Sequence, residues 1–251
     1  VFAPTSHYRS FAIANGARTG SCVIVPFTGL LHPSHFVEPI DRLPVKPELG
    51  LGQRPVLVAV TRLEPVKRAV DLVEVLVGVR EKFPDASLVV VGEGSQRSEM
   101  LDLVDSRDLV KDFLLIGSRA QEWIASFLAE ADVVVAPMMG RALVEAALSA
   151  TPIVAYDTDW HGELIDDGET GRLVSCGDVA AMTRAVCDLL TQRESGRIMG
   201  GFARLRVMDS MSRDTVLAAE REAWARLVPH LVDEDPGDSH TPDKTEGTGG
   251  R

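Results

Sequence analysis

The chain of 251 residues has few cysteines, and their spacing does not suggest pairs. Cys22, Cys176 and Cys187 are odd in number and include no CxxC spacing, whereas disulfide frameworks and zinc sites both need grouped thiols. Free thiols are typical of a reducing compartment, so we expect a cytoplasmic protein. No run of about 18 apolar residues occurs either, and no transmembrane helix is predicted.

Positive charge is also scarce. The 26 lysines and arginines are outnumbered by 37 aspartates and glutamates, which gives a formal net charge of -11. Such a balance does not favour a nucleic-acid surface, and we expect no nucleic-acid partner. The last segment, 231–251, is acidic and rich in glycine, proline and threonine. A disordered acidic tail is therefore predicted there.

The motifs of common nucleophilic enzymes are missing as well. A triad hydrolase of the usual α/β type would carry G-x-S-x-G, which this chain lacks. No Ser/His/Asp or Cys/His set stands at a recognisable spacing. The composition itself is that of a globular protein, with 45% hydrophobic and 25% charged residues, and it is ample for a packed core.

Apolar runs alternate with helical patterns through the middle of the chain. The runs are rich in Val, Ile and Leu, which is typical of strands covered by helices on both faces. Strand and helix at this spacing predict right-handed βαβ units around a parallel sheet. We therefore predict a doubly wound, Rossmann-like α/β domain over residues 45–230. Its predicted strands are 55–60, 86–92, 112–117, 132–137, 152–157 and 171–176, and its predicted helices are 65–83, 95–107, 121–131, 140–150, 178–190, 195–206 and 212–228.

Two basic residues follow the first predicted strand of this domain. Arg62 lies just past the strand, and Lys67 is expected in the first turn of the next helix. Ligands of open α/β sheets bind outside the carboxyl ends of the strands, and a helix N-terminus favours anions. Two cations there suit a diphosphate. The alternative is a pair of solvated surface cations.

The second strand ends in the glycine pattern of Gly92 and Gly94. This G-x-G resembles the start of a dinucleotide fingerprint, but Arg97 stands at the third glycine position. A lone G-x-G is weak evidence, so a tight strand-to-helix turn is favoured over NAD binding. The turn would still let a ligand approach the backbone.

Glu145 is a carboxylate inside an otherwise apolar predicted helix, 140–150. A buried carboxylate is costly without partners, and a ribose diol can supply two hydroxyl donors to it. Gly140, just upstream, would let backbone amides approach a phosphate or sugar closely. The alternatives are that Glu145 faces solvent or pairs with Arg141 at i,i+4.

The segment after the fifth strand, 157–163, reads DTDWHGE. Its Asp157 and Asp159 form a DxD pattern that could hold a divalent metal together with a diphosphate. Such short patterns arise often by chance, so we expect no metal. Trp160 and His161 either line a pocket or pack the loop.

Taken in order, four segments resemble the C-terminal half of a group 1 (GT4-like) glycosyltransferase of the GT-B fold. They are VTRLEPVKRAVDLVEV, LVVVGEGSQRSEM, EADVVVAPMMGRALVEAALSATPIVAYD and HGELIDDGETGRLVSCGD. The resemblance covers roughly residues 56–228. It implies retaining transfer of a sugar from a nucleotide-diphosphate sugar to an acceptor, which would be a glycan, a lipid-linked molecule or a small molecule.

The resemblance also implies roles for individual residues. Arg62 and Lys67 match the family's basic pair, which binds the donor diphosphate and stabilises the leaving nucleotide without metal or cofactor. Glu145 matches the second glutamate of its E-x7-E motif, which holds the ribose. The glycine-rich turn and the residues after it would also contact the substrate, and base choice would depend on loops near two further residues. These substrate-binding residues are Gly140, Arg141, Ala142 and Leu143, together with Gly92 and Ser118 near the base.

Two departures from the family pattern bear on function. The first glutamate of E-x7-E would stand where this chain has Pro137, which puts the donor-sugar contact in doubt. A GT-B enzyme also has a complete N-terminal domain, and residues 1–44 resemble only its last helix and strand plus a linker rich in Pro and Gly. The last predicted helix, 212–228, would cross back toward that missing partner domain. It would then expose an apolar stripe of Val216, Leu217, Ala223, Trp224, Leu227 and Val228.

These departures leave two other functions open. One is a non-catalytic binding or assembly module that kept the half-fold. The other is a sugar-nucleotide epimerase or phosphorylase on the same fold, although no lysine context for pyridoxal phosphate is recognisable. The resemblance also leaves open a peripheral position at the inner face of the membrane, since many group 1 enzymes act on lipid-linked acceptors there.

Overall fold

The protein is described from a computed structural model, which covers residues 1–26, 36 and 43–228. The predicted acidic tail, 231–251, lies outside the described residues. So does most of the predicted linker that precedes residue 44.

Six parallel strands form the central sheet, in the order β5-β4-β3-β6-β7-β8. The first of them in the chain, β3, lies in the middle. The chain adds β4 and β5 on one side of it, then crosses over and adds β6, β7 and β8 on the other. This order belongs to the doubly wound, Rossmann-like sheet, so the predicted fold class is confirmed. The strands are β3 (Val56–Val60), β4 (Ser87–Val91), β5 (Phe113–Leu115), β6 (Val133–Ala136), β7 (Ile153–Asp157) and β8 (Arg172–Ser175).

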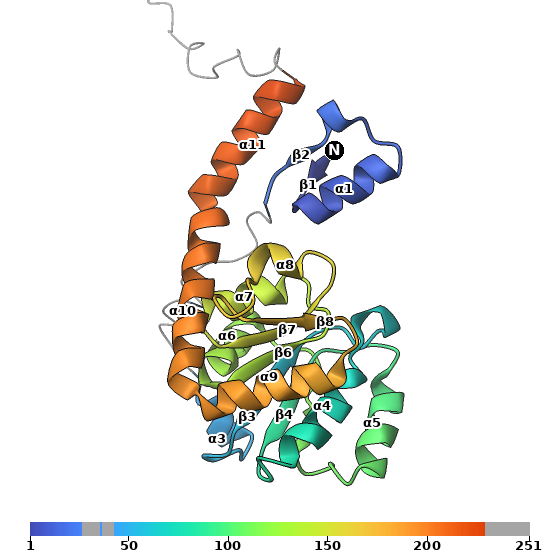
Figure 1. Cartoon of the computed structure of the whole chain (residues 1–251), viewed down its shortest axis with the longest axis vertical. Helices are drawn as coiled ribbons and strands as arrows, with labels where there is room; N and C mark the ends of the chain where they lie inside the picture. Colours follow the sequence, from blue (N-terminus) through green and yellow to red (C-terminus); the bar gives the residue numbers. More distant parts are fainter. Residues whose placement is uncertain (27–35, 37–42, 229–251) are drawn as a thin grey trace, which may run out of the picture.

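Helices cover both faces of this sheet (Figure 1). One face carries α4 (Asp71–Arg80), α5 (Arg97–Ser106) and α9 (Val179–Thr191). The other carries α3 (Val45–Glu48), α6 (Gln121–Glu130), α7 (Ala142–Leu148), α8 (His161–Leu164) and α10 (Arg193–Ser210). The short helices α3 and α8 were not predicted, because four residues are too few to show a helical period.

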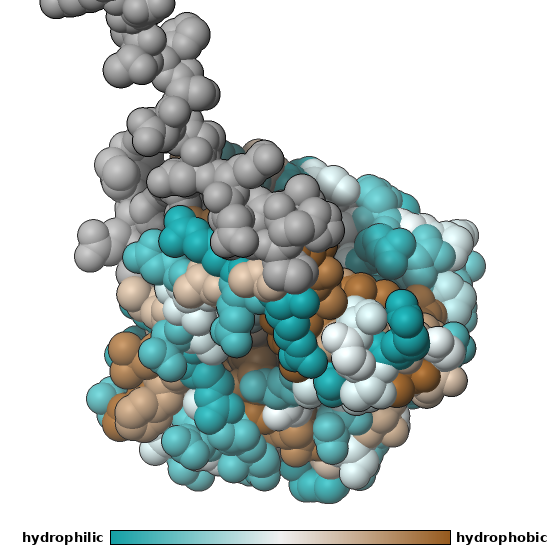
Figure 2. Space-filling view, turned by 90° about the horizontal axis from the view of Figure 1, so that it is seen from above, coloured by the Kyte–Doolittle hydropathy of each residue, from teal (hydrophilic) through white to brown (hydrophobic). Residues whose placement is uncertain are grey.

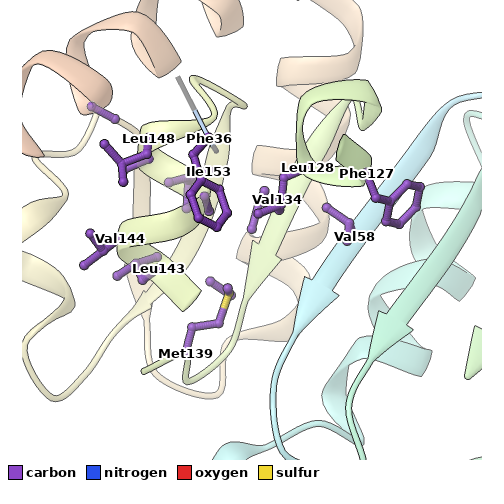
Figure 3. Packing of buried hydrophobic residues seen from close by; sticks show 14 of the residues in the cluster. Phe36, Val58, Phe127, Leu128, Val134, Met139, Leu143, Val144, Leu148 and Ile153 are labelled. Carbon is purple, nitrogen blue, oxygen red and sulfur yellow. The ribbon is translucent and has the colours of Figure 1, made fainter. Parts of the chain in front are cut away.

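Alternate strand residues build two hydrophobic clusters, one on each face. In β3, Val56 and Val58 belong to one cluster, while Leu57 and Ala59 belong to the other. Figure 3 shows part of the first cluster around Phe36, with side chains from α6 and α7. Complete burial of a large apolar side chain contributes about 1.5–3 kcal/mol. A slip of one residue in any strand would exchange the two faces, so the register is fixed by the core.

One predicted helix, 65–83, is divided in two, and this changes the expected setting of Lys67. Residues Pro65–Lys67 form a 3₁₀ turn, and Arg68 ends it in the left-handed conformation at φ 52°. The α-helix α4 begins only at Asp71, and the Asp71 carboxylate accepts hydrogen bonds from Arg68 Nε at 2.8 Å and from the Tyr156 hydroxyl at 3.0 Å. The prediction that Lys67 sits in the first turn of the following α-helix is therefore wrong, since the left-handed residue interrupts the helical backbone.

The N-terminal residues form a small unit beside the last helix (Figure 1). Strands β1 (Phe2–Ala3) and β2 (Val23–Ile24) pair in parallel, with α1 (Ser6–Ala14) and a 3₁₀ turn (Thr19–Ser21) between them. Helix α11 (Arg213–Leu227) crosses from the sheet unit and packs on β2.

The apolar stripe predicted on α11 is only partly exposed. Val216 and Ala223 are buried against Val23 and Val25, because the N-terminal unit covers this side of the helix. Trp224 remains 43% exposed and meets the edge of the Phe2 ring, with centroids 5.1 Å apart.

The surface mixes hydrophilic and hydrophobic side chains, as one face of the molecule shows in Figure 2. Scattered apolar side chains are ordinary on a protein surface. Among the described residues, no helix has the length and hydrophobicity needed to span a membrane.

Candidate functional site

A cavity of about 730 Å³ opens at the carboxyl ends of the central strands. Its floor lies where β3 and β6 are neighbours, which is the point at which the strand order reverses. Loops after these two strands run to opposite faces of the sheet, so a crevice forms between them, and this is where such folds bind ligands. The lining residues are Val60, Thr61, Arg62, Lys67, Val91, Gly92, Glu93, Ser118, Arg119, Ile124, Gly140, Arg141, Ala142 and Glu145.

The cavity is positive although the chain is acidic. Four basic and two acidic side chains line it, which leaves a net charge of +2 against -11 for the whole chain. Within the described residues, neither Arg62 nor Lys67 forms an ion pair. Burial lowers the pKa of the Lys67 ammonium, the nearby Arg62 guanidinium lowers it further, and Asp159 opposes both. An anionic ligand would stabilise two adjacent cations that form no ion pair with the described residues.

The turn at residues 138–141, called the glycine turn here after Gly140, precedes α7 and borders this cavity. Several contacts hold it in place. The Thr61 hydroxyl lies 3.4 Å from the Met138 carbonyl oxygen, and the Leu143 amide donates to the Gly140 carbonyl at 3.0 Å. The Met139 side chain is completely buried in the core (Figure 3). A Cβ placed on Gly140 would meet no protein atom within 4 Å. Protein packing therefore does not require glycine here, whereas a ligand lying against the turn would.

Glu145 projects from α7 and is half-buried at the cavity. Burial raises the pKa of its carboxyl, while Arg141 and a hydrogen bond with Gln121 oppose the rise. Arg141 and Glu145 do not form an ion pair within 4 Å, so the i,i+4 pairing considered as an alternative to ribose binding is not present. The half-buried carboxyl group can therefore still accept hydrogen bonds from the hydroxyl groups of a ligand.

Gly92 has a different reason to be glycine. Its φ is 147°, and a Cβ there would lie 1.9 Å from the Thr61 carbonyl oxygen. A Cβ on Gly94 would lie 2.3 Å from the Leu63 carbonyl oxygen. Both glycines let the loops after β3 and β4 pack backbone to backbone. Gly92 lines the cavity, but the close approach of the Thr61 carbonyl already requires glycine there. This favours the interpretation of G-x-G as a tight strand-to-helix turn.

A carboxylate fastens these same two loops together. The Glu64 side chain accepts hydrogen bonds from the Ser95 hydroxyl at 2.6 Å and from the Ser95 amide at 3.1 Å. The two bonds lower the pKa of Glu64, and Arg62 lowers it further. The loop that carries Arg62 and Lys67 is thereby held against the loop of Gly92.

Most of the predicted site residues converge, but one does not. The Leu143 side chain is fully buried in the hydrophobic core and lies outside the cavity, because it points from α7 toward the sheet. Ser118 lies on the cavity wall, where its carbonyl accepts a bond from Arg119 Nη1 at 3.1 Å. Sequence reasoning missed Glu93 and Arg119, whose signal was their place directly after β4 and β5.

The segment 157–163 packs a loop and does not form a metal cluster. Asp159 Oδ2 accepts the Tyr8 hydroxyl at 3.1 Å, and Asp159 Oδ1 lies 3.4 Å from His7 Nε2. Among the described residues, no group of three or more His, Cys, Asp or Glu side chains could hold a metal ion. Trp160 and His161 are buried at 1% and 0% exposure, so they pack the loop and do not line the pocket.

Fold and cavity together define a Rossmann-like domain with a positive crevice at its switch point, in the class that binds phosphate-bearing ligands. Residues 42–206 match the family described as "Glycosyl transferases group 1". The chain belongs to this family, and its sheet is the Rossmann-like half of a GT-B fold.

Curated relatives are similar over much of this chain. The GDP-mannose-dependent alpha-(1-6)-phosphatidylinositol monomannoside mannosyltransferase of Mycolicibacterium smegmatis is 28% identical over 204 residues, which is 74% of this chain and 53% of that protein. The glycogen synthase of Mycobacterium tuberculosis is 28% identical over 174 residues, 67% of this chain and 42% of that protein. The chain thus spans about half the length of these relatives.

Solved structures agree in fold. HepE from Anabaena, in complex with UDP and glucose, superposes with a TM-score of 0.81 at 19% identity, over 90% of this chain and 62% of that one. Sucrose-phosphate synthase from Thermosynechococcus elongatus superposes with a TM-score of 0.77 at 21% identity, over 92% of this chain and 58% of that one. At these identities the likeness shows the fold alone.

Proposed function

We propose that this chain supplies the donor-binding half of a glycosyltransferase that uses a nucleotide-diphosphate sugar. The observation that carries the proposal is the juxtaposition of Arg62, Lys67 and Glu145 in one cavity: within the described residues the two cations form no ion pair, and they line the same cavity as a half-buried carboxyl group. This set suits two adjacent parts of a nucleotide sugar, because cations bind its diphosphate and a carboxylate accepts hydrogen bonds from its ribose diol.

In this arrangement Arg62 and Lys67 bind the diphosphate and Glu145 accepts the ribose hydroxyls. During transfer, the bond between the anomeric carbon and the diphosphate oxygen breaks, and the electron pair stays on the leaving oxygen. The two cations stabilise the charge that develops there. The acceptor hydroxyl forms the new bond to the anomeric carbon and passes its proton to the departing diphosphate oxygen. We propose transfer with retention, on the family resemblance, and charge neutralisation by side chains with no metal.

The relatives point to donors of this kind. One curated relative is named for GDP-mannose, and HepE was solved with UDP and glucose. Guanine and uracil are therefore both candidates for the base of the donor that this chain binds. The acceptor, whether glycan, lipid-linked or small molecule, would be bound with the N-terminal GT-B domain, since the chain spans about half of its relatives.

Nucleotide binding by the chain itself tests this proposal. We would measure thermal shift and calorimetry with UDP, GDP and ADP, with and without magnesium. Ligand at about 100 times its dissociation constant should stabilise the fold by about 2.7 kcal/mol. At the same nucleotide concentration, Glu145→Ala and Lys67→Ala should each lose about half of this stabilisation or more, while the exposed controls Glu81→Ala and Lys111→Ala should keep it. A folded chain that binds none of the three nucleotides would refute the proposal.

Pro137 favours a second candidate, a non-catalytic binding module. The family carboxylate near the donor sugar is absent at this position, so the cavity could bind nucleotide without directing the sugar. Incubation of the full-length protein with a nucleotide sugar, followed by product analysis, separates the functions. A sugar transferred to acceptor or water supports the enzyme, an altered donor sugar supports an epimerase, and an unchanged donor supports the binding module.

A further inference from the structure

His161 is a buried side chain that contacts the backbone of the glycine turn. It begins α8 and is completely inaccessible to solvent. Its Nε2 lies 2.9 Å from the Met139 carbonyl oxygen, and its Nδ1 lies 2.9 Å from the Tyr156 carbonyl oxygen. The ring therefore bridges the end of β7 and the residue immediately before Gly140.

Both of these partners are acceptors only. A neutral imidazole has one N–H and one lone pair, so it can donate to one carbonyl while its lone pair faces the other. Two lone pairs 2.9 Å apart in a buried site repel each other, and an unsatisfied buried acceptor costs about 1–3 kcal/mol. The imidazolium ion has two N–H groups and satisfies both carbonyls.

Charged side chains lie on the segment of the ring and on the elements packed against it. On its own segment are Asp157, Asp159 and Glu163, all acidic. From the packed elements come Arg141 on the glycine turn and Arg206 on α10, whose charge Asp166 neutralises. Lys67 and His7 interact with Asp159.

We propose that His161, as a doubly donating imidazolium, is a positioning residue that holds the Met139–Gly140 backbone in the shape that accepts a nucleotide diphosphate. The inference rests on the proposed function for its ligand. It does not rest on that function for the bridge itself, which is a property of the unliganded protein. His161 touches no substrate and acts through the turn.

Two variants of similar size divide the bridge into its halves. The amide nitrogen of glutamine occupies about the place of Nε2, so His161→Gln can still donate to Met139. The amide nitrogen of asparagine occupies about the place of Nδ1, so His161→Asn can donate only to Tyr156. Both variants lose one hydrogen bond, so a merely structural role predicts equal effects on the site.

The positioning role predicts unequal effects. Calorimetry with UDP and GDP should show near-normal affinity for His161→Gln and about tenfold weaker affinity for His161→Asn, a difference of about 1.4 kcal/mol. The amide signal of Gly140 in nitrogen–proton spectra of the free protein should stay in place for His161→Gln and shift or broaden for His161→Asn. Equal affinities and equal Gly140 spectra in the two variants would overturn the proposal.

The protonation state has its own readout. Nitrogen-15 spectra of the wild-type ring at neutral pH should show two protonated nitrogens. One protonated and one bare nitrogen would overturn the doubly donating form. The spectra of the ring and of Gly140 need no ligand, so they remain decisive if the wild-type chain binds no nucleotide. In that case the proposed function fails while the bridge is still tested.

Discussion

The Glu163 carboxylate accepts the backbone N–H of His7 at 2.8 Å and that of Ser6 at 2.9 Å, across more than 150 positions of sequence. It thereby caps the first turn of α1 from the sheet unit. Asp159, four residues earlier, holds the Tyr8 hydroxyl on the same turn. The N-terminal unit is thus fixed against the segment that follows β7, next to the glycine turn.

Acidification should release this contact. Burial raises the pKa of Glu163, but the amides of His7 and Ser6 outweigh it and leave the pKa lowered from 4.5. A carboxyl with a lowered folded pKa contributes its stability above about pH 4.5 and loses it as pH falls through the lower value. Hydrogen exchange of the α1 amides should therefore accelerate in acid. In Glu163→Gln this exchange should already be fast at neutral pH, because the lost cap destabilises the first turn of α1 by about 1 kcal/mol, and it should change less with acid. Exchange rates equal to those of the wild type would contradict the cap.

Nucleotide binding should release a proton near Glu145 in mildly acidic solution. Burial raises its pKa above 4.5 in the free protein, so the carboxylate is disfavoured there and the cost disappears as it protonates at low pH. Ribose hydroxyl donors would stabilise the carboxylate and lower that pKa again. Calorimetry at about pH 5 in two buffers of different ionisation enthalpy should detect the released proton. Glu145→Gln should bind more weakly and release none, and an equal release from this variant would assign the proton elsewhere.

The affinity for nucleotide should fall in alkaline solution because of Lys67. Burial and the Arg62 charge lower its pKa from 10.5, so the free protein loses this ammonium proton at a lower pH than an exposed lysine does. A bound diphosphate would raise the pKa again. Affinity is therefore full below the lowered pKa and declines as pH rises through it. Lys67→Arg should remove this decline, while Lys67→Ala should bind about tenfold more weakly at neutral pH; a decline that persists in the arginine variant would exclude Lys67 as its source.

Two glycines of the cavity should respond oppositely to alanine. Gly140 has open space around its missing Cβ, so Gly140→Ala should fold normally, with stability raised by about 0.4–1 kcal/mol, and yet bind nucleotide poorly. Gly92→Ala would bring Cβ to 1.9 Å from the Thr61 carbonyl at φ 147°, and should lower the free energy of unfolding by about 2 kcal/mol or more. Urea unfolding and calorimetry measure both. Normal nucleotide affinity in Gly140→Ala would show that no ligand lies against the turn.

Much of the fold could be predicted from local patterns. The apolar runs at 55–60 and 132–137 contain β3 and β6, and the basic pair and Glu145 line one cavity at the carboxyl ends of the strands, as the predicted order of strands implied. The helix at 65–83 was predicted too long, since helical periodicity continues through Arg68 while its backbone turns left-handed. Leu143 was assigned to the site by neighbourhood in sequence, although its side chain faces the core.

The sequence by itself determined the doubly wound sheet, because hydrophobic period and chain length between strands leave few arrangements of βαβ units. It also determined which loops share one edge, since parallel strands all end on the same side. Only the tertiary structure decided which charged side chains come close enough to form ion pairs, which glycines a Cβ would clash with, and where His161 points. Those properties depend on distances between segments remote in the chain, such as Thr61 and Gly92 or Met139 and His161, and no local pattern encodes such distances.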